Sequence, residues 1–148
     1  MGKEIERKFL VKGEYKHLAV KEIKITQGYL SVDPERIIRV RICANTAFLT
    51  IKSPVKKTGF TRNEWEFEIP VSMAAGIMEI CLPGKVIKTR YKVPFSDHIF
   101  EVDQFHGKNE GLTVAEIELN GEDEKFEKPD WLGDEVTGMP DYYNSNLI

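Results

Sequence analysis

Acidic and basic side chains recur at every second position in several short stretches of this chain. Examples of like charges separated by a single residue are Glu4 and Glu6, Arg39 and Arg41, and Glu116 and Glu118. Successive side chains of a β-strand point to opposite faces, so the members of each pair would share a face and repel one another mildly. We therefore expect each pair to face groups of opposite charge.

The basic residues suit a ligand rich in phosphate. Arg offers planar, bidentate donors to phosphate oxygens, and Lys offers a compact charge. The residues predicted to contact phosphate are Lys8, Arg39, Arg41, Lys52, Lys88 and Arg90.

The carboxylates suit a hard divalent cation, Mg²⁺ or Mn²⁺, which prefers oxygen ligands. The predicted metal ligands are Glu4, Glu6, Asp103, Glu116 and Glu118. One cation would bridge phosphate oxygens while a second lowers the pKa of a bound water for in-line attack. The residues predicted to take part in catalysis are Glu4, Glu6, Lys8, Tyr29 and Lys52. Tyr29 has two interpretations, because it either orients a water or phosphate, or packs as an aromatic residue at the end of a barrel.

Other kinds of catalytic site find little support. No Ser-His-Asp or Cys-His arrangement can be argued, and His17, His98 and His106 lack the spacing of metal ligands and are expected in surface or loop roles. The stretch 107–111 lacks a Walker pattern and is predicted to be a hairpin loop. Among the acidic residues near position 66, Glu64 is a candidate to orient an Arg, and Glu68 is expected at a solvated rim.

Alternation with a period of two predicts the elements that position these residues. Strands are expected at 3–11, 25–32, 36–43, 46–53, 61–70, 85–94, 98–105 and 112–120. Helices are expected at 72–82, where Ser72 can cap the start, and at 14–22, 122–126 and 141–146. The chain is thus predicted to be mainly β, with a few covering helices.

Nearly every predicted strand has one charged face and one apolar face. A sandwich with its charged faces in water is one explanation. A closed antiparallel barrel of eight strands with the charges inside is the other, and it explains why acids and bases are grouped by strand. Buried charges need partners, and a polyphosphate with its metal ions supplies both signs. A barrel of this size holds one small ligand.

Composition limits the class of protein. The 148 residues fit one domain spanning 1–148, and 21 basic against 24 acidic residues give a net charge of −3, which argues against a nucleic-acid partner. No apolar run is long enough to cross a membrane, and the charged N-terminus does not resemble a signal peptide. Cys43 and Cys81 do not suggest a disulfide framework. A cytoplasmic location is expected.

The ordered motifs resemble the CYTH superfamily, also called triphosphate tunnel metalloenzymes. Glu4-Ile5-Glu6-Arg7-Lys8 is similar to the ExExK motif at the N-terminus of that family. The motifs that follow in order are Gln27-Gly28-Tyr29-Leu30, Arg39-Val40-Arg41, Leu49-Thr50-Ile51-Lys52, Arg62-Asn63-Glu64, Lys88-Thr89-Arg90-Tyr91, Glu101-Val102-Asp103 and Ala115-Glu116-Ile117-Glu118. The tail, through Tyr142-Tyr143-Asn144-Ser145, resembles the short bacterial members.

The resemblance implies an eight-stranded tunnel that handles a triphosphate with Mg²⁺ or Mn²⁺, and it assigns the same metal-associated and phosphate-contacting residues. It does not choose among the activities of the family. Hydrolysis of the terminal phosphate of inorganic triphosphate is favoured, because the charged residues offer little to stack on a base. A class IV type adenylate cyclase and a non-catalytic polyphosphate-binding module are the alternatives. The apolar outer face exceeds what a few helices cover, which favours a homodimer.

Overall fold

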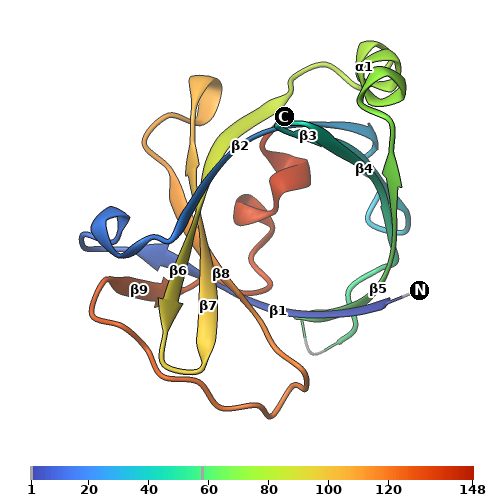
Figure 1. The fold of residues 1–148 in the computed structure, drawn as a ribbon. Coiled ribbons are helices and arrows are strands. Elements are labelled where there is room, and N and C mark those ends of the chain that lie inside the picture. The colour runs from blue at the N-terminus through green and yellow to red at the C-terminus, as the bar shows by residue number, and fades with distance from the viewer. Residues whose placement is uncertain (1, 58) are drawn as a thin grey trace.

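The computed structural model describes residues 2–57 and 59–148, and its strands wind into a closed barrel (Figure 1). The barrel strands are β1 (Gly2–Val11), β2 (Lys21–Ser31), β3 (Ile37–Cys43), β4 (Thr46–Lys52), β5 (Thr61–Ile69), β6 (Val86–Phe95), β7 (His98–Phe105) and β8 (Thr113–Glu118). Outside this ring lie α1 (Val71–Glu79) and the short strand β9 (Leu132–Glu135).

The strands are hydrogen-bonded in the order β5-β4-β3-β2-β6-β7-β8-β1-β9, and β5 also pairs with β1, which closes eight of them into a ring. All the pairings are antiparallel. Closure removes the unpaired edges that an open sheet would present. The predicted eight-stranded antiparallel barrel is confirmed, and the predicted strand bounds agree closely, except that β2 begins four residues earlier than expected.

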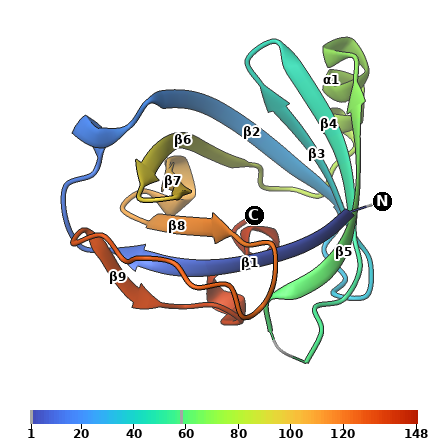
Figure 2. The same cartoon turned by 60° about the horizontal axis from the view of Figure 1, so that its bottom comes forward.

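The apolar faces of the strands point outward and are covered from outside. On β1, β6, β7 and β8 they form a cluster with Trp131 and Leu132, which come from the segment after the barrel (Figure 2). On β3 and β4, Val40 and Ala47 pack beneath α1. The contact with α1 is so close that a Cβ at Gly28 would lie 2.8 Å from the sulfur of Met78. Hydrophobic packing therefore holds most of the barrel from outside and leaves the middle of its interior for polar groups.

The C-terminal tail turns back into the ring and runs inside it, as Figure 1 shows in red. It forms two 3-10 turns, η3 (Pro140–Tyr142) and η4 (Asn144–Asn146). Leu147 is buried against Tyr29, Val86 and Phe105. A carbon atom at Gly84 would clash with Ile148, at 2.7 Å, so a side chain there would push against the end of the tail.

Several helix predictions were wrong. Residues 14–22 contain only the 3-10 turn η1 (Lys16–Leu18), because β2 extends back to Lys21 to pair with β6. Residues 122–123 form a turn and 124–126 have no regular structure, and 141–146 is interrupted at Tyr143 between η3 and η4. The helix expected at 72–82 is Val71–Glu79, it begins after Pro70, and Ser72 does not cap it. In the part of the chain that the structure describes, a single α-helix covers the barrel.

No helix formed by the described residues has the length and apolar character to cross a membrane. Apolar side chains remain exposed on the outside, including Phe67, Met73 and Ile80, the last at 74%. The expected homodimer stays a prediction.

Candidate active site

The barrel encloses a polar cavity with a volume of about 240 Å³. All the predicted site residues line it except Asp103: Glu4, Glu6, Lys8, Tyr29, Arg39, Arg41, Lys52, Lys88, Arg90, Glu116 and Glu118. They come from β1, β2, β3, β4, β6 and β8. The strand register brings them together, since it places Lys8 opposite Glu116 and Lys52 opposite Glu64.

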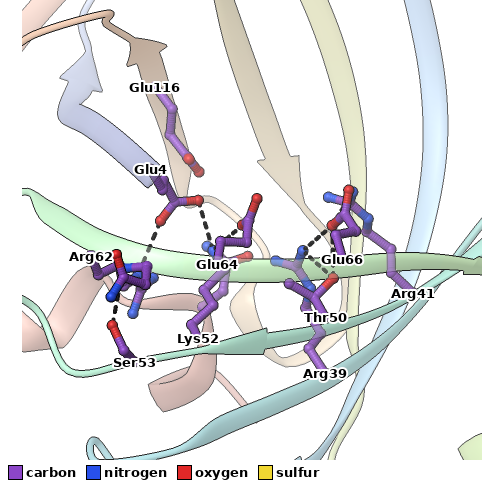
Figure 3. Close-up of polar contacts among 12 residues, drawn as sticks. Glu4, Arg39, Arg41, Thr50, Lys52, Ser53, Arg62, Glu64, Glu66 and Glu116 are labelled. Atoms are coloured by element: carbon purple, nitrogen blue, oxygen red, sulfur yellow. Dashed lines mark hydrogen bonds and ion pairs between the residues drawn. The ribbon is translucent and has the colours of Figure 1, made fainter. Parts of the chain in front are cut away.

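Glu4 joins two cations from neighbouring strands (Figure 3). Lys52 Nζ donates to its Oε2 at 2.9 Å, and Arg62 Nε donates to Oε1 at 3.0 Å. Burial alone would raise the pKa of Glu4, but the charges of Lys52 and Arg62 outweigh it and hold that pKa at about 2. Glu4 is therefore ionised, and Glu64 contacts the same ammonium at 3.5 Å. The prediction that Glu64 orients an Arg was wrong, because its partner is a Lys.

Glu66 contacts the arginines instead (Figure 3). Its Oε2 lies 3.5 Å from Arg39 Nη2 and 3.6 Å from Arg41 Nη2 and accepts a hydrogen bond from Thr50 Oγ1 at 2.7 Å. Burial and the neighbouring charge of Arg39 lower the pKa of Arg41. The Nε atoms of Arg39 and Arg41 are buried and make no hydrogen bond within the described part of the chain. Two guanidinium groups are thus held side by side with donors left over for an anion.

Asp103 lies behind the wall of the cavity and is fully buried. It is 2.8 Å from Lys88 Nζ, and Arg90 donates to both of its oxygens at 2.8 and 2.9 Å. Burial lowers the pKa of Lys88 to about 8, although Asp103 opposes this shift. In this placement Asp103 serves as counter-ion to two cations that reach the cavity. Its role as a metal ligand stays a prediction.

Glu6 and Glu116 form a pair of interacting carboxyl groups. Enclosure, together with the charges of Glu116 and Glu4, raises the pKa of Glu6 well above its usual value. Burial would also raise the pKa of Glu116, but Lys8 and then Arg90 reverse the shift and lower it well below its usual range. The proton of the pair therefore sits on Glu6 and the charge on Glu116.

This pair is the part of the site that fits a divalent cation. Carboxyl oxygens are the ligands that Mg²⁺ and Mn²⁺ prefer, and a cation would replace the proton that now separates two like charges. Across residues 2–57 and 59–148, no three Asp, Glu, His or Cys side chains are already gathered around one point. Such a site is nonetheless typical of Mg²⁺, which is often held by one or two carboxylates together with phosphate oxygens of the substrate.

Tyr29 packs as an aromatic residue at one end of the barrel, and its role toward a water or phosphate stays a prediction. Its ring is buried with Leu147, while its hydroxyl lines the cavity side and accepts a hydrogen bond from Gln27 Nε2 at 3.0 Å. Burial raises the pKa of Tyr29, so its hydroxyl stays protonated.

The sequence did not identify every residue of the cavity. Arg62, Glu66 and Glu101 also line it, and so do residues 143–145 of the tail. Arg62 and Glu66 lie on the charged face of β5 with Glu64, so the alternation could have found them. No pattern in the tail indicates that it enters the barrel. The histidines lie outside the cavity, where His98 pairs with Glu124 at 2.6 Å.

Comparison with known proteins agrees with this geometry. The CYTH domain matches residues 2–143. The chain is 49% identical over 150 residues to a protein of Acetivibrio thermocellus named inorganic triphosphatase. The match covers 100% of this chain and 94% of that protein. A protein of Nitrosomonas europaea with the same name is 34% identical over 148 residues, covering 97% of this chain and 95% of the relative.

Solved structures share the barrel. A crystal structure of an inorganic triphosphatase superposes with a TM-score of 0.65 at 34% identity, covering 97% of this chain and 95% of its own. A conserved hypothetical protein of Pyrococcus furiosus superposes with a TM-score of 0.64 at 22% identity over 80% of this chain and 79% of its own, which shows likeness of fold alone. A match over nearly the whole length, together with two relatives above 30% identity, establishes that the chain belongs to the CYTH domain family.

Proposed function

We propose that this protein hydrolyses the terminal phosphate of a triphosphate, with inorganic triphosphate as its preferred substrate. The observation that carries the proposal is the enclosed cavity, in which cations from five strands face one small space. Relatives at 49% and 34% identity that are named inorganic triphosphatases support it.

The cationic side chains bind and orient the phosphate chain. Arg39 and Arg41 line the cavity from β3, and Lys8, Lys52 and Lys88 approach from three other strands. Asp103 already holds Lys88, and Glu66 already contacts Arg39 and Arg41, so these three cations need little reorganisation when the anion arrives. Phosphoryl transfer depends mainly on such positioning and on charge stabilisation.

Glu6 and Glu116, with Glu4 beside them, are proposed to hold Mg²⁺ or Mn²⁺. The bound cation would supply charge neutralisation on phosphate oxygens and would lower the pKa of a coordinated water. Glu116, which carries the charge of the pair, is placed to accept a proton or a cation. The tyrosyl hydroxyl of Tyr29 remains a donor at neutral pH because its pKa is raised by burial.

Size supports the preference for a triphosphate without a nucleoside. Pockets that enclose drug-sized ligands have volumes of roughly 300–1,000 Å³, whereas this cavity measures about 240 Å³ and is lined mainly by charged groups. Tyr143, an aromatic ring at its edge, already faces Lys8 Nζ at 5.9 Å from the ring centroid. A base would find little apolar surface inside.

The test is a phosphate-release assay on inorganic triphosphate, ATP and thiamine triphosphate, with Mg²⁺ and with Mn²⁺, in which cyclic AMP is measured in the same samples. We expect orthophosphate and pyrophosphate from inorganic triphosphate at a kcat/KM at least tenfold above that for ATP. Equal kcat/KM values for the two would overturn the preference. Cyclic AMP and pyrophosphate from ATP without orthophosphate would replace hydrolysis by cyclisation, and tight binding without turnover would indicate a binding module.

Cytoplasmic location and a homodimer are part of the same proposal. Cys43 and Cys81 are both free thiols, as expected in a reducing compartment. Exposed apolar side chains on α1 and β5 offer a surface for a second copy.

A further inference from the structure

One end of the barrel is closed by the C-terminal tail. The end of β2, the start of β6 and the end of β7 meet there, and their residues Tyr29, Val86 and Phe105 pack against Leu147. Residues 143–145, directly before Leu147, line the cavity itself. The tail thus lies across the tunnel and forms a floor.

This floor is anchored to the barrel. Asn109 Nδ2 donates to the carbonyl oxygen of Leu147 at 2.7 Å, and Lys108 Nζ donates to that of Ile148 at 2.6 Å. Lys8 Nζ donates to the carbonyl oxygen of Tyr142 at 3.0 Å. With Leu147 only 8% exposed, the tail is packed as part of the fold.

Asn144 is the tail residue that meets the phosphate-binding cations. Its Oδ1 accepts a hydrogen bond from Lys88 Nζ at 2.8 Å and one from Gln27 Nε2 at 3.1 Å. Gln27 is fully buried, and its Oε1 has no partner among the described residues. A side-chain amide held between a buried Lys and a buried Gln has a fixed position.

The opposite end is open. Glu118, at the end of β8, lines the cavity and is exposed, and Lys92, near the end of β6, is 38% exposed and lies 3.8 Å from Glu101. A polyphosphate therefore enters past Glu118 and Glu101 and advances toward Asn144.

We propose that Asn144 is a specificity-determining residue: it ends the tunnel and so limits the length of the phosphate chain that the cavity accepts. This inference rests on the proposed function for the class of substrate. The first phosphate to enter stops at the side-chain amide of Asn144, which is bonded to Lys88. A longer phosphate chain would have to displace the anchored tail. A terminal phosphate that bears a nucleoside cannot enter first, for the same reason.

The test compares Asn144→Ala, which lengthens the cavity, with Asn144→Gln, whose longer side chain shortens it. Binding of pyrophosphate, tripolyphosphate and tetrapolyphosphate is measured by titration calorimetry in EDTA at low ionic strength. We expect the ratio of tetrapolyphosphate to tripolyphosphate affinity to rise at least about tenfold in Asn144→Ala, the scale on which a shaped pocket discriminates by size. In Asn144→Gln the ratio of pyrophosphate to tripolyphosphate affinity should rise.

Asn146→Ala is the matched control, because Asn146 lies in the same 3-10 turn and does not line the cavity, and its side chain donates only to the carbonyl oxygen of Pro140 among the contacts described. It should leave both ratios unchanged. Equal changes in all three variants, or unchanged ratios in both Asn144 variants, would overturn the inference.

The proposed function is tested separately by hydrolysis with Mg²⁺ or Mn²⁺. A wild-type protein that binds but does not hydrolyse tripolyphosphate would refute the activity while leaving the length limit to be decided by the binding ratios. Rapid hydrolysis with no change of ratio in the Asn144 variants would refute the length limit alone.

Discussion

Asp103→Asn should destabilise the ligand-free protein and strengthen its stabilisation by polyphosphate. Asp103 is fully buried and its carboxylate lies within 2.9 Å of the charged groups of both Lys88 and Arg90. The Asn side chain keeps the shape but loses the negative charge. Two cations would then share a buried space without their counter-ion.

The magnitude follows from this environment. Breaking a buried ion pair by removing one partner costs about 3–5 kcal/mol, and an Asn that still accepts one hydrogen bond places the loss near the lower figure. For a chain of this size, 1 kcal/mol shifts Tm by about 2–4 °C, so we expect Tm to fall by about 6–12 °C. An anion bound in the cavity replaces the lost charge, so tripolyphosphate should raise Tm more in the variant than in the wild type.

Thermal unfolding with and without tripolyphosphate measures both effects, with Glu68→Gln as a control at an exposed carboxylate outside the cavity. A parallel titration with Mg²⁺ separates the two roles of Asp103. If it is only a counter-ion, the Mg²⁺ concentration needed for half-maximal activity stays the same. A Tm within 2 °C of the wild type, or a large rise in that Mg²⁺ concentration, would refute the counter-ion role.

Three further substitutions test the remaining charged groups. Glu6→Gln should abolish phosphate release without lowering the free energy of unfolding in urea at pH 7, because burial and the neighbouring charge of Glu116 raise the pKa of Glu6 and so favour its neutral carboxyl; a less stable variant would contradict this expectation. The kcat/KM of the wild type should fall above about pH 8, because the pKa of Lys88 is lowered to about 8. Lys88→Arg should remove this fall, because Arg stays charged; an unchanged fall at alkaline pH would show that another group titrates. Glu4→Gln should cost about 3 kcal/mol at pH 7, the value of lowering a pKa from 4.5 to about 2. Since the folded pKa is depressed, this stability is fully present above pH 4.5 and disappears as the pH falls toward 2, where urea unfolding of variant and wild type should converge.

The barrel and its charged interior could be predicted from the sequence because both follow from alternation. Charged and apolar side chains alternate along β1 and β8, so the pattern determines which residues share a face. A closed barrel then requires one set to point inward. The enclosed cavity lined by Glu4, Arg39 and Lys52 follows directly.

Features that depend on packing between distant segments could not be predicted in this way. Alternation predicts that Asp103 points inward. It does not predict that Lys88 and Arg90 lie between Asp103 and the cavity. The tail has no amphipathic period, and its position is decided by the burial of Leu147 at one end of the barrel. The helix expected at 14–22 failed because pairing with β6 extended β2 through Lys21, and strand pairing outweighed local propensity.

Charge balance in the cavity explains why acids and bases are both needed. Seven carboxylates and seven cationic side chains line it among the described residues. With the proton of the Glu6 and Glu116 pair and the buried carboxylate of Asp103 counted, the charges of the interior balance. Such an interior binds a bare, highly charged triphosphate less tightly than one whose charge divalent cations have largely cancelled. The bases alone would hold the phosphate chain too tightly to release the product, and the acids alone would repel it. Substrate and metal should therefore bind cooperatively, each providing the counter-charge that makes the other favourable in an enclosed space of low dielectric.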